Sequence, residues 1–169
     1  MKNEDVTAMT FRNNGAIPNN EELPVLLYSG VFKDNPEVCR DVFTENNWTN
    51  SWLGSIHEYD HYHSNTHEVL GIVNGSAQIR IGGKKGTNFD MREGDVIVLP
   101  AGTGHRLMSA SFDFRVVGAY PEGKSYNEKT GKPEERDSSI EEMKQVPLPE
   151  KDPVYGENGP LIKMWAEEE

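Results

Sequence analysis

Four of the five histidines in this chain lie within one window of twelve residues, and a glutamate closes that window. Histidines that serve only as scattered structural residues are not expected to cluster in this way. Imidazole nitrogens beside a carboxylate oxygen form a ligand set that divalent transition metals prefer. The window therefore predicts a metal site. Its candidate residues are His57, His61, His63, His67 and Glu68, and the fifth histidine is His105.

The spacing of these residues suits a β-strand, because side chains alternate between the two faces of a strand. A strand over 57–63 would place two histidines at i and i+2 on one face, where they can chelate one ion. Ser64 and Asn65 form a natural turn that returns the chain antiparallel, so Glu68 on the returning strand would face the same ion. The shared face of the predicted strand comprises His57, Tyr59, His61 and His63.

Three side chains of the window have less defined roles. His67 would face away from the ion, which favours a role in packing or in supporting a ligand. A bulge at the turn would instead bring His67 in as a ligand in place of Glu68. His57 is a candidate pocket residue that meets the substrate, and Tyr59 is a candidate pocket wall or proton donor.

A distant segment is expected to complete the site. His105 follows a tight, glycine-rich approach at 100–104, which sets one side chain at the start of the next strand. Three imidazoles and one carboxylate leave one or two positions open on a five- or six-coordinate ion. An open position is typical of a catalytic or substrate-binding metal.

The composition limits the classes of function. The chain has 169 residues, a formal net charge of −11 and a pI of about 4.9, which argues against nucleic-acid binding and against association with anionic membranes. The N-terminus at 1–5 is polar and lacks the apolar core of a signal peptide, so we expect a cytoplasmic protein. The single cysteine, Cys39, sits in an apolar context and is expected to be a buried filler.

Between Ser55 and Tyr120 the chain consists of short β segments separated by glycine-rich turns, which predicts an antiparallel sandwich or barrel. Apolar residues alternate with polar ones in 76–81, whereas Val96–Leu99 has no polar face and would be covered on both sides. The predicted strands are 55–63, 66–73, 76–81, 87–91, 96–99, 105–110 and 112–119.

The flanking regions carry fewer signals. Residues 1–22 indicate an arm with room for one short strand, and Pro24 predicts that the apolar stretch 23–28 is an edge strand. Asn35 and Pro36 predict the start of a short helix with one apolar stripe that ends near Asn46.

The C-terminal extension at 121–169 is acidic and rich in proline. Ser139 and Glu142 are spaced as in a capping box, which predicts a short helix over 137–144. The apolar residues of the extension are expected to pack onto the barrel or onto a second subunit.

Two spaced motifs resemble those of the cupin superfamily. His61-x-His63-x4-Glu68-x6-Gly75 resembles the first cupin motif, and Gly94-x5-Pro100-x-Gly102-x2-His105 resembles the second. The resemblance covers 54–120 and implies an all-β fold, the double-stranded β-helix or jelly-roll barrel, with a metal at its mouth. Carried over residue by residue, the implied ligands are His61, His63, Glu68 and His105.

The chain departs from the cupin pattern at Gly54, six rather than five residues before the first histidine, and at Ser109, where asparagine is usual. Neither is a ligand. Over its whole length the chain is similar to the bacterial YjlB-like group of small single-domain cupins, as in Ile17-Pro18-Asn19-Asn20 and Tyr120-Pro121-Glu122-Gly123. We therefore expect one domain over 1–169, with an arm at 1–53, a barrel core at 54–120 and an extension at 121–169.

These features favour a metal-dependent enzyme that acts on a small polar molecule. With iron, three histidines and one glutamate leave room for oxygen and a bidentate substrate, so dioxygenase-like oxidoreductase chemistry is favoured. Manganese, nickel or zinc would suit an isomerase or lyase. The alternatives are a non-enzymatic barrel that binds a small ligand or a metal, and a barrel whose histidines are structural. Because single-domain cupins usually pair, the resemblance also predicts a homodimer.

Overall fold

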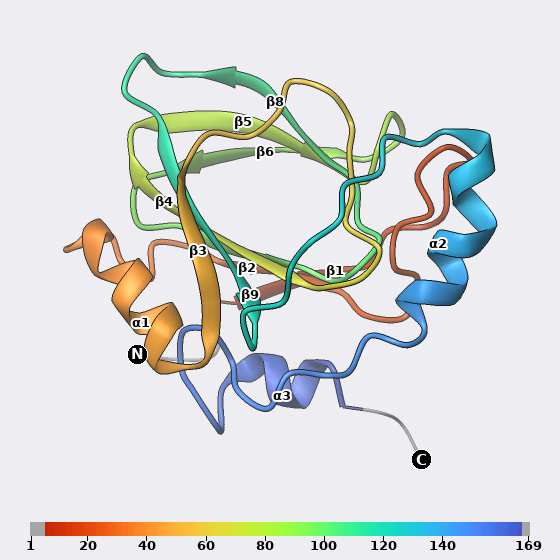
Figure 1. The fold of residues 1–169 in the computed structure, drawn as a ribbon. Coiled ribbons are helices and arrows are strands. Elements are labelled where there is room, and N and C mark those ends of the chain that lie inside the picture. Colours follow the sequence, from red (N-terminus) through yellow and green to blue (C-terminus); the bar gives the residue numbers. More distant parts are fainter. Residues whose placement is uncertain (1–5, 167–169) are drawn as a thin grey trace.

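Two antiparallel sheets enclose a barrel in the computed structural model, which describes residues 6–166, so the polar stretch 1–5 lies outside it (Figure 1). The six-stranded sheet has the order β1-β2-β7-β4-β9-β3, and the three-stranded sheet has the order β6-β5-β8. This is an all-β jelly roll, as predicted. The strands are β1 (Val6–Met9), β2 (Val25–Tyr28), β3 (Trp48–Gly54), β4 (Glu68–Asn74), β5 (Ser76–Ile81), β6 (Thr87–Arg92), β7 (Val96–Leu99), β8 (His105–Ala110) and β9 (Arg115–Pro121).

The six-stranded sheet is apolar on both faces, because each face has its own core. Strand β7 shows this directly: Ile97 and Leu99 point into the barrel, while Val96 and Val98 point outward, so this strand is covered on both sides as predicted. In β5, apolar and polar residues alternate as expected, with only one face buried. The interior cluster closes the barrel below its mouth.

Helices cover the outside of the six-stranded sheet and one side of the barrel (Figure 1). They are the 3-10 helix η2 (Pro36–Val38), α1 (Cys39–Glu45), η3 (Pro133–Glu135), α2 (Arg136–Met143) and α3 (Pro160–Met164). Helix α1 forms where the sequence predicts it and approaches β4 so closely that a Cβ on Gly71 would lie 2.8 Å from the Cys39 sulfur. Cys39 is buried, as expected. None of the helices among residues 6–166 has the length and apolar character needed to cross a membrane.

The C-terminal extension packs back onto the barrel of its own chain. Leu161, in α3, and Trp165, just after it, are buried in the outer core. The Trp165 indole donates a hydrogen bond to the Pro24 carbonyl (2.9 Å). Figure 1 shows α3 beneath the sheet and α2 beside the barrel.

Some predicted elements are wrong. The predicted strand 55–63 does not form: the segment makes isolated bridges, from His61 to His105 and from Tyr62 to Lys129, instead of a continuous ladder, and the strand lies earlier, at β3. The predicted turn at Ser64 and Asn65 does not form a hairpin, since β4 pairs with β7 and β9.

Two predictions made from short sequence patterns are also wrong. The strand after Pro24 is not an edge strand, since β2 lies between β1 and β7; the proline precedes the strand and costs it no ladder hydrogen bond. The predicted capping box is wrong as well. Helix α2 begins at Arg136, so Ser139 and Glu142 lie inside it and bond to the barrel instead.

Candidate metal centre

The segment that holds His61 and His63 is irregular, but backbone hydrogen bonds fix it on both sides. His61 N donates to the carbonyl of His105, the first residue of β8 (3.2 Å), and His105 N donates to the His61 carbonyl (2.9 Å). On the other side, Tyr62 and Lys129 exchange two backbone hydrogen bonds, each of 2.9 Å. These bonds bring histidines from distant parts of the sequence to one point.

Three imidazoles converge inside the mouth of the barrel. His61, His63 and His105 each offer a ring nitrogen, and these atoms all lie within 4.8 Å of one another. The three residues are buried, with 4%, 6% and 2% of their surface exposed. Their types and geometry could hold a metal ion.

The Glu68 carboxylate faces the same point. Its Oε1 lies 3.2 Å from His105 Nε2, and its Oε2 lies 3.4 Å from His63 Nε2. Tyr120, on the neighbouring strand β9, donates a hydrogen bond from its hydroxyl to Oε2 (2.5 Å). Oε1 makes no hydrogen bond to any described group, although it is buried. A buried carboxylate oxygen without a donor is one that a cation would satisfy.

Backbone carbonyls set the tautomer of each imidazole. In all three rings Nδ1 faces a carbonyl oxygen, so Nδ1 carries a hydrogen and donates it. In a neutral ring, Nε2 is then left with a lone pair, which is the arrangement found in histidines that bind metals. The accepting carbonyls are those of Tyr59 for His61 (3.0 Å), Thr103 for His105 (3.1 Å) and Asn127 for His63.

Burial and neighbouring charged groups shift the pKa values of these histidines and of Glu68. Burial, together with the neighbouring His105 ring, lowers the pKa of His61 to about 2. Burial alone would raise the pKa of Glu68, but attraction to His63 and contact with His105 outweigh it and lower the pKa. Burial opposes protonation of His63, yet the Glu68 carboxylate raises its pKa overall. Glu68 is therefore ionised, and the cluster attracts a positive charge into its centre.

A pocket of about 320 Å³ opens above these groups. Its size is at the lower end of the range for small-molecule sites. Tyr126 stacks on Tyr120, with ring centroids 4.5 Å apart, and the Trp52 indole donates to the Tyr120 hydroxyl (2.8 Å). The walls are thus aromatic, and the chain Trp52–Tyr120–Glu68 links them to the carboxylate. The pocket is lined by Trp52, Ser55, Ile56, His57, His61, His63, Glu68, Leu70, His105, Tyr120, Tyr126 and Glu128.

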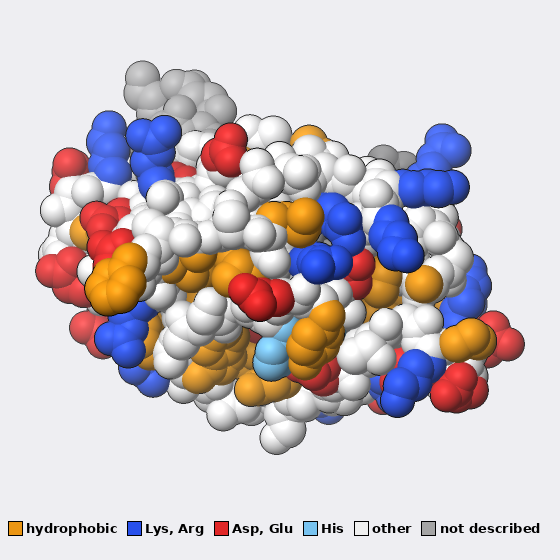
Figure 2. Space-filling model, turned by 90° about the horizontal axis from the view of Figure 1, so that it is seen from above, with side chains coloured by type: hydrophobic (Ala, Val, Ile, Leu, Met, Phe, Trp, Pro, Cys, Tyr) orange, Lys and Arg blue, Asp and Glu red, His pale blue; other side chains and the backbone are white. Residues whose placement is uncertain are grey.

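The rim of the pocket is polar. The Glu128 carboxylate lies 2.9 Å from His57 Nε2 and accepts a hydrogen bond from the Tyr59 hydroxyl (3.0 Å). His57 and Tyr59 stack on each other with centroids 4.7 Å apart. The His57 side chain is 52% exposed, and one patch of histidine surface is visible beside acidic and hydrophobic side chains in Figure 2.

His67 lies on the other side of β4, away from the three imidazoles. Its Nδ1 accepts a hydrogen bond from the backbone N–H of Ala101 (2.9 Å), and its ring packs against Trp165 at 4.8 Å. Burial lowers its pKa to about 4, an effect that the nearby Pro147 carbonyl partly opposes. No bulge turns His67 toward the three imidazoles, and Glu68 is the side chain that points to them.

Comparison with known proteins identifies the family. The family model described as Cupin matches residues 60–131. The Bacillus subtilis (strain 168) protein named "Uncharacterized protein YjlB" is 44% identical over 156 residues, which cover 92% of this chain and 94% of that protein. The chain belongs to the cupin family. Within it, the chain is YjlB-like over nearly its whole length, as the sequence predicts.

Solved cupin-like structures resemble this cupin in fold alone. The WlaRB TDP-quinovose 3,4-ketoisomerase from Campylobacter jejuni is 15% identical, with a TM-score of 0.40, over 47% of this chain and 65% of that one. Procruciferin, an 11S globulin from Brassica napus, is 18% identical, with a TM-score of 0.41, over 66% and 28%. A DUF861 family protein from Thermotoga maritima is 23% identical, with a TM-score of 0.35, over 50% and 89%. The chain thus spans less than two thirds of the first two proteins.

The structure of this cupin gathers part of the predicted set of residues. His57 lines the pocket, and Tyr59 stands at the rim, bonded to Glu128, rather than in the pocket wall. His67 lies outside the cluster. The residues that meet at one point are His61, His63, Glu68 and His105.

Several residues that shape the site escape sequence reasoning. Tyr120, Tyr126 and Glu128 come from the end of β9 and the loop after it, where no periodic pattern marks them. The only signal was that Tyr120 stands in a phrase shared with the YjlB-like group. Asn127 binds His63 through its backbone carbonyl, which any residue could supply.

Proposed function

We propose that this cupin is a metal-dependent enzyme that acts on a small polar molecule. One divalent transition metal would be held by His61, His63, Glu68 and His105. The observation that best supports the proposal is the convergence of three imidazoles, each with its Nδ1 already bonded, on a carboxylate. Iron, manganese, nickel and zinc all accept such ligands. When bound, such an ion supplies Lewis acidity and, for iron, redox chemistry.

Tyr120 supports the ligand role of Glu68. Its hydroxyl occupies Oε2 and fixes the carboxylate plane, which leaves Oε1 free of hydrogen bonds to described groups. Burial raises the pKa of Tyr120 and the adjacent Glu68 charge raises it further, so this hydroxyl stays protonated and donates at neutral pH. The Trp52 indole in turn donates to the hydroxyl oxygen, so hydrogen bonds connect the wall of the pocket to Glu68.

Dioxygenase-like chemistry is favoured over an isomerase or lyase. An isomerase or lyase needs a free base next to the substrate. In the pocket, Glu68 is engaged by Tyr120, and the rim histidine His57 is engaged by Glu128. Oxidation at a metal makes a smaller demand on protein bases. The aromatic walls formed by Trp52 and Tyr126 suit a small substrate shielded from water.

The metal is tested first. Freshly purified protein should contain about one divalent metal per chain by elemental analysis, and His61→Ala or His105→Ala should release it. His57→Ala is the matched control, because His57 belongs to the same histidine window and is not a proposed ligand. Metal-free protein that takes up no iron, manganese, nickel or zinc on reconstitution would refute the proposed centre.

Turnover is tested second, as oxygen uptake by iron-loaded protein with a panel of small diols, thiols and keto acids. Uptake that depends on both the iron and one of these compounds supports the enzyme. The alternative is a non-enzymatic cupin that binds a small ligand or the metal itself, and the engaged state of Glu68 and His57 favours it. Binding of panel compounds without turnover, with every metal tested, would establish that alternative.

A further inference from the structure

The pocket above the three imidazoles contains no basic side chain. Of the residues that line it within 6–166, none is a lysine or an arginine, and the acidic ones are Glu68 at the base and Glu128 at the rim. Carboxylate and phosphate groups of a ligand are normally bound by arginine or lysine side chains. The pocket therefore lacks the side chains with which enzymes usually hold an acidic substrate.

The basic residues next to the metal ligands point to the other side of the three-stranded sheet. His105 and Leu107 in β8 face inward, so the side chain of Arg106 between them faces outward. Its register partner in β5, Arg80, lies on the same outer face and donates a hydrogen bond to Asp60 (2.7 Å). This positive charge is adjacent to a ligand in the sequence, yet the sheet separates it from the pocket.

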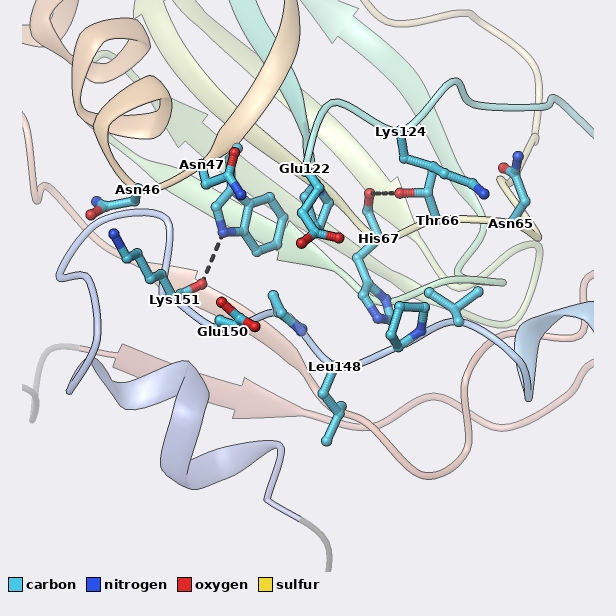
Figure 3. Close-up of a pocket in the computed structure, with 15 residues that line it drawn as sticks. Asn46, Asn47, Asn65, Thr66, His67, Glu122, Lys124, Leu148, Glu150 and Lys151 are labelled. Carbon is cyan, nitrogen blue, oxygen red and sulfur yellow. Dashed lines mark hydrogen bonds between the residues drawn. The ribbon is translucent and has the colours of Figure 1, made fainter.

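The lysines of the loop after β9 also lie away from the metal pocket. The loop supplies Tyr126 and Glu128 to this pocket, but its Lys124 lines a separate cavity of about 550 Å³ on the outer side of the six-stranded sheet (Figure 3). The two cavities share no lining residue. Lys129 pairs through its backbone with Tyr62 and lines neither cavity. Neither lysine therefore reaches the space above the imidazoles.

Two hydroxyls in the pocket are available to a ligand. Ser55 and Tyr126 line it, and their hydroxyls form no hydrogen bond to any residue within 6–166. The Tyr126 ring is held by stacking on Tyr120 and by an edge contact with His63, with ring centroids 5.2 Å apart in the second pair. A hydroxyl is uncharged and both donates and accepts, so it pairs with the hydroxyl, carbonyl or amide groups of a neutral ligand.

The Glu128 carboxylate places a negative charge at the rim. It is held by His57 Nε2 (2.9 Å) and by the Tyr59 hydroxyl (3.0 Å), and its side chain is 35% exposed. A divalent ion together with Glu68 would retain one positive charge, which the first anionic group of a ligand neutralises. A second anionic group near the rim would face Glu128 without a cation to pair with, and an unpaired charge of this kind discriminates against a ligand.

We propose that the substrate of the metal centre is an uncharged chelating molecule, such as a small diol or hydroxyketone, and not an organic acid or a phosphate ester. This inference deepens the proposed function and rests on it. The hydroxyls of Ser55 and Tyr126 would pair with neutral groups of the substrate, while Glu128 would repel an acidic group at the end remote from the metal. The aromatic wall that includes Trp52 would contact its apolar part.

The test compares two catechols that share a chelating diol and differ in the charge of the opposite end. One is protocatechuate, which carries a carboxylate there, and the other is its amide. Binding to zinc-loaded protein is measured by isothermal titration calorimetry, because zinc has no redox chemistry and the readout needs no turnover. We expect the amide to bind at least about tenfold more tightly than the acid, since the acid places an unpaired charge near Glu128.

Variants of Glu128 identify the source of this discrimination. Glu128→Gln should bring the two affinities close together, and Glu128→Lys should reverse the preference in favour of the acid. Glu134→Gln, which removes the same charge at an exposed position outside the pocket, should keep the preference of the unaltered protein.

Three results would overturn the proposal. They are zinc-loaded protein that binds the acid as tightly as the amide, zinc-loaded protein that binds neither, and an unchanged preference in both variants of Glu128. Protein that takes up no zinc or other metal refutes the metal centre itself. Elemental analysis detects that failure before any catechol is added, so the two failures are distinguishable.

Discussion

Tyr120 and Glu68 lie opposite one another on neighbouring strands, and the tyrosine hydroxyl donates a hydrogen bond of 2.5 Å to Glu68 Oε2. This contact orients the only carboxylate in the proposed ligand set. Tyr120→Phe removes the hydroxyl but keeps the ring and its stacking on Tyr126. We expect metal affinity to fall about 10- to 100-fold, as is usual when the partner of a ligand is lost.

The affinity of Tyr120→Phe is measured by competition with a coloured chelator. Tyr126→Phe is the control, because Tyr126 touches the same rings and makes no hydrogen bond to Glu68. Equal metal affinity in the two variants would contradict the role assigned to the Tyr120 hydroxyl.

Helix α2 supports His63 from outside the region that matches the cupin family model. Glu142 accepts hydrogen bonds from the Ser64 hydroxyl (2.5 Å) and from the Asn127 side chain (3.1 Å). The Asn127 carbonyl in turn accepts the hydrogen of His63 Nδ1. Glu142→Ala should remove the hydrogen bonds to Ser64 and Asn127 and so weaken metal binding about tenfold while the barrel remains folded.

Calorimetric metal titration measures this effect, and circular dichroism checks the fold. The matched control is Glu141→Ala on the same helix, since Glu141 is exposed and, within residues 6–166, its one ion pair is with Lys144 at 3.3 Å. Glu142→Gln keeps the acceptor oxygen and should restore most of the affinity. A Glu142→Ala variant that binds metal as tightly as Glu141→Ala would show that the hydrogen bonds of Glu142 have no influence on the metal site.

The Trp52 indole lies directly over Gly118 in β9. A Cβ at residue 118 would come within 2.4 Å of the indole ring. Gly118→Ala should therefore push the indole out of the pocket wall and break its hydrogen bond to Tyr120. We expect Trp52 fluorescence to shift to the red, measured in a Trp48→Phe, Trp165→Phe background, because the displaced ring meets more water. A spectrum identical to that of the parent background would mean that other parts of the pocket wall move to make room for the new Cβ and that the indole stays in place.

The fold was predictable where neighbouring residues determine the structure. Apolar alternation in 76–81 and the unbroken apolar run Val96–Leu99 each formed the predicted strand. The stripe that begins at Val38 and Cys39 formed helix α1. In these segments the pattern of burial repeats with the period of the element, so the sequence records it directly.

The histidine window shows where such reasoning fails. His61 and His63 were expected to share the face of a regular strand, and they meet the third imidazole without one. Tyr62 pairs with Lys129, a residue 67 positions away, and no local period encodes such a pairing. The carbonyl that fixes His63 belongs to the backbone of Asn127, so it leaves no mark on residue type. Ligand types can be inferred from sequence more readily than the contacts that orient them.

We propose that the protein is a homodimer. The strands β3 and β8 are the end strands of their sheets, and the edge of β3, unlike that of β8, which bonds to the backbone of His57 and His61, tends to pair with another chain unless protected. Leu53 and Met108 on these strands are 45% and 40% exposed, and Phe112, in the turn after β8, is fully exposed. Light scattering at micromolar concentration should give twice the monomer mass. Phe112→Ser should lower that mass, and a monomer for the unaltered protein would refute the proposal.

Cys39 gives the stability of the protein a dependence on alkaline pH. Burial raises the pKa of its thiol from 9.0 to about 12. Below pH 9 the thiol is protonated in both the folded and the unfolded chain, so it contributes no pH dependence. Between these two values the unfolded chain loses the proton and the folded chain keeps it, so the stabilisation decreases as the pH rises.

Urea unfolding of the unaltered protein and of Cys39→Ala is compared at pH 8 and pH 10.5. Because both proteins carry the same tyrosines, the difference between their unfolding free energies isolates the effect of the thiol. The variant loses packing of the thiol against Gly71, which adds an offset that does not change with pH. Relative to the variant, the unaltered protein should lose about 1.4 kcal/mol of unfolding free energy for each pH unit above 9. A difference between the two proteins that stays constant from pH 8 to pH 10.5 would show that the folded chain releases this proton as readily as the unfolded one.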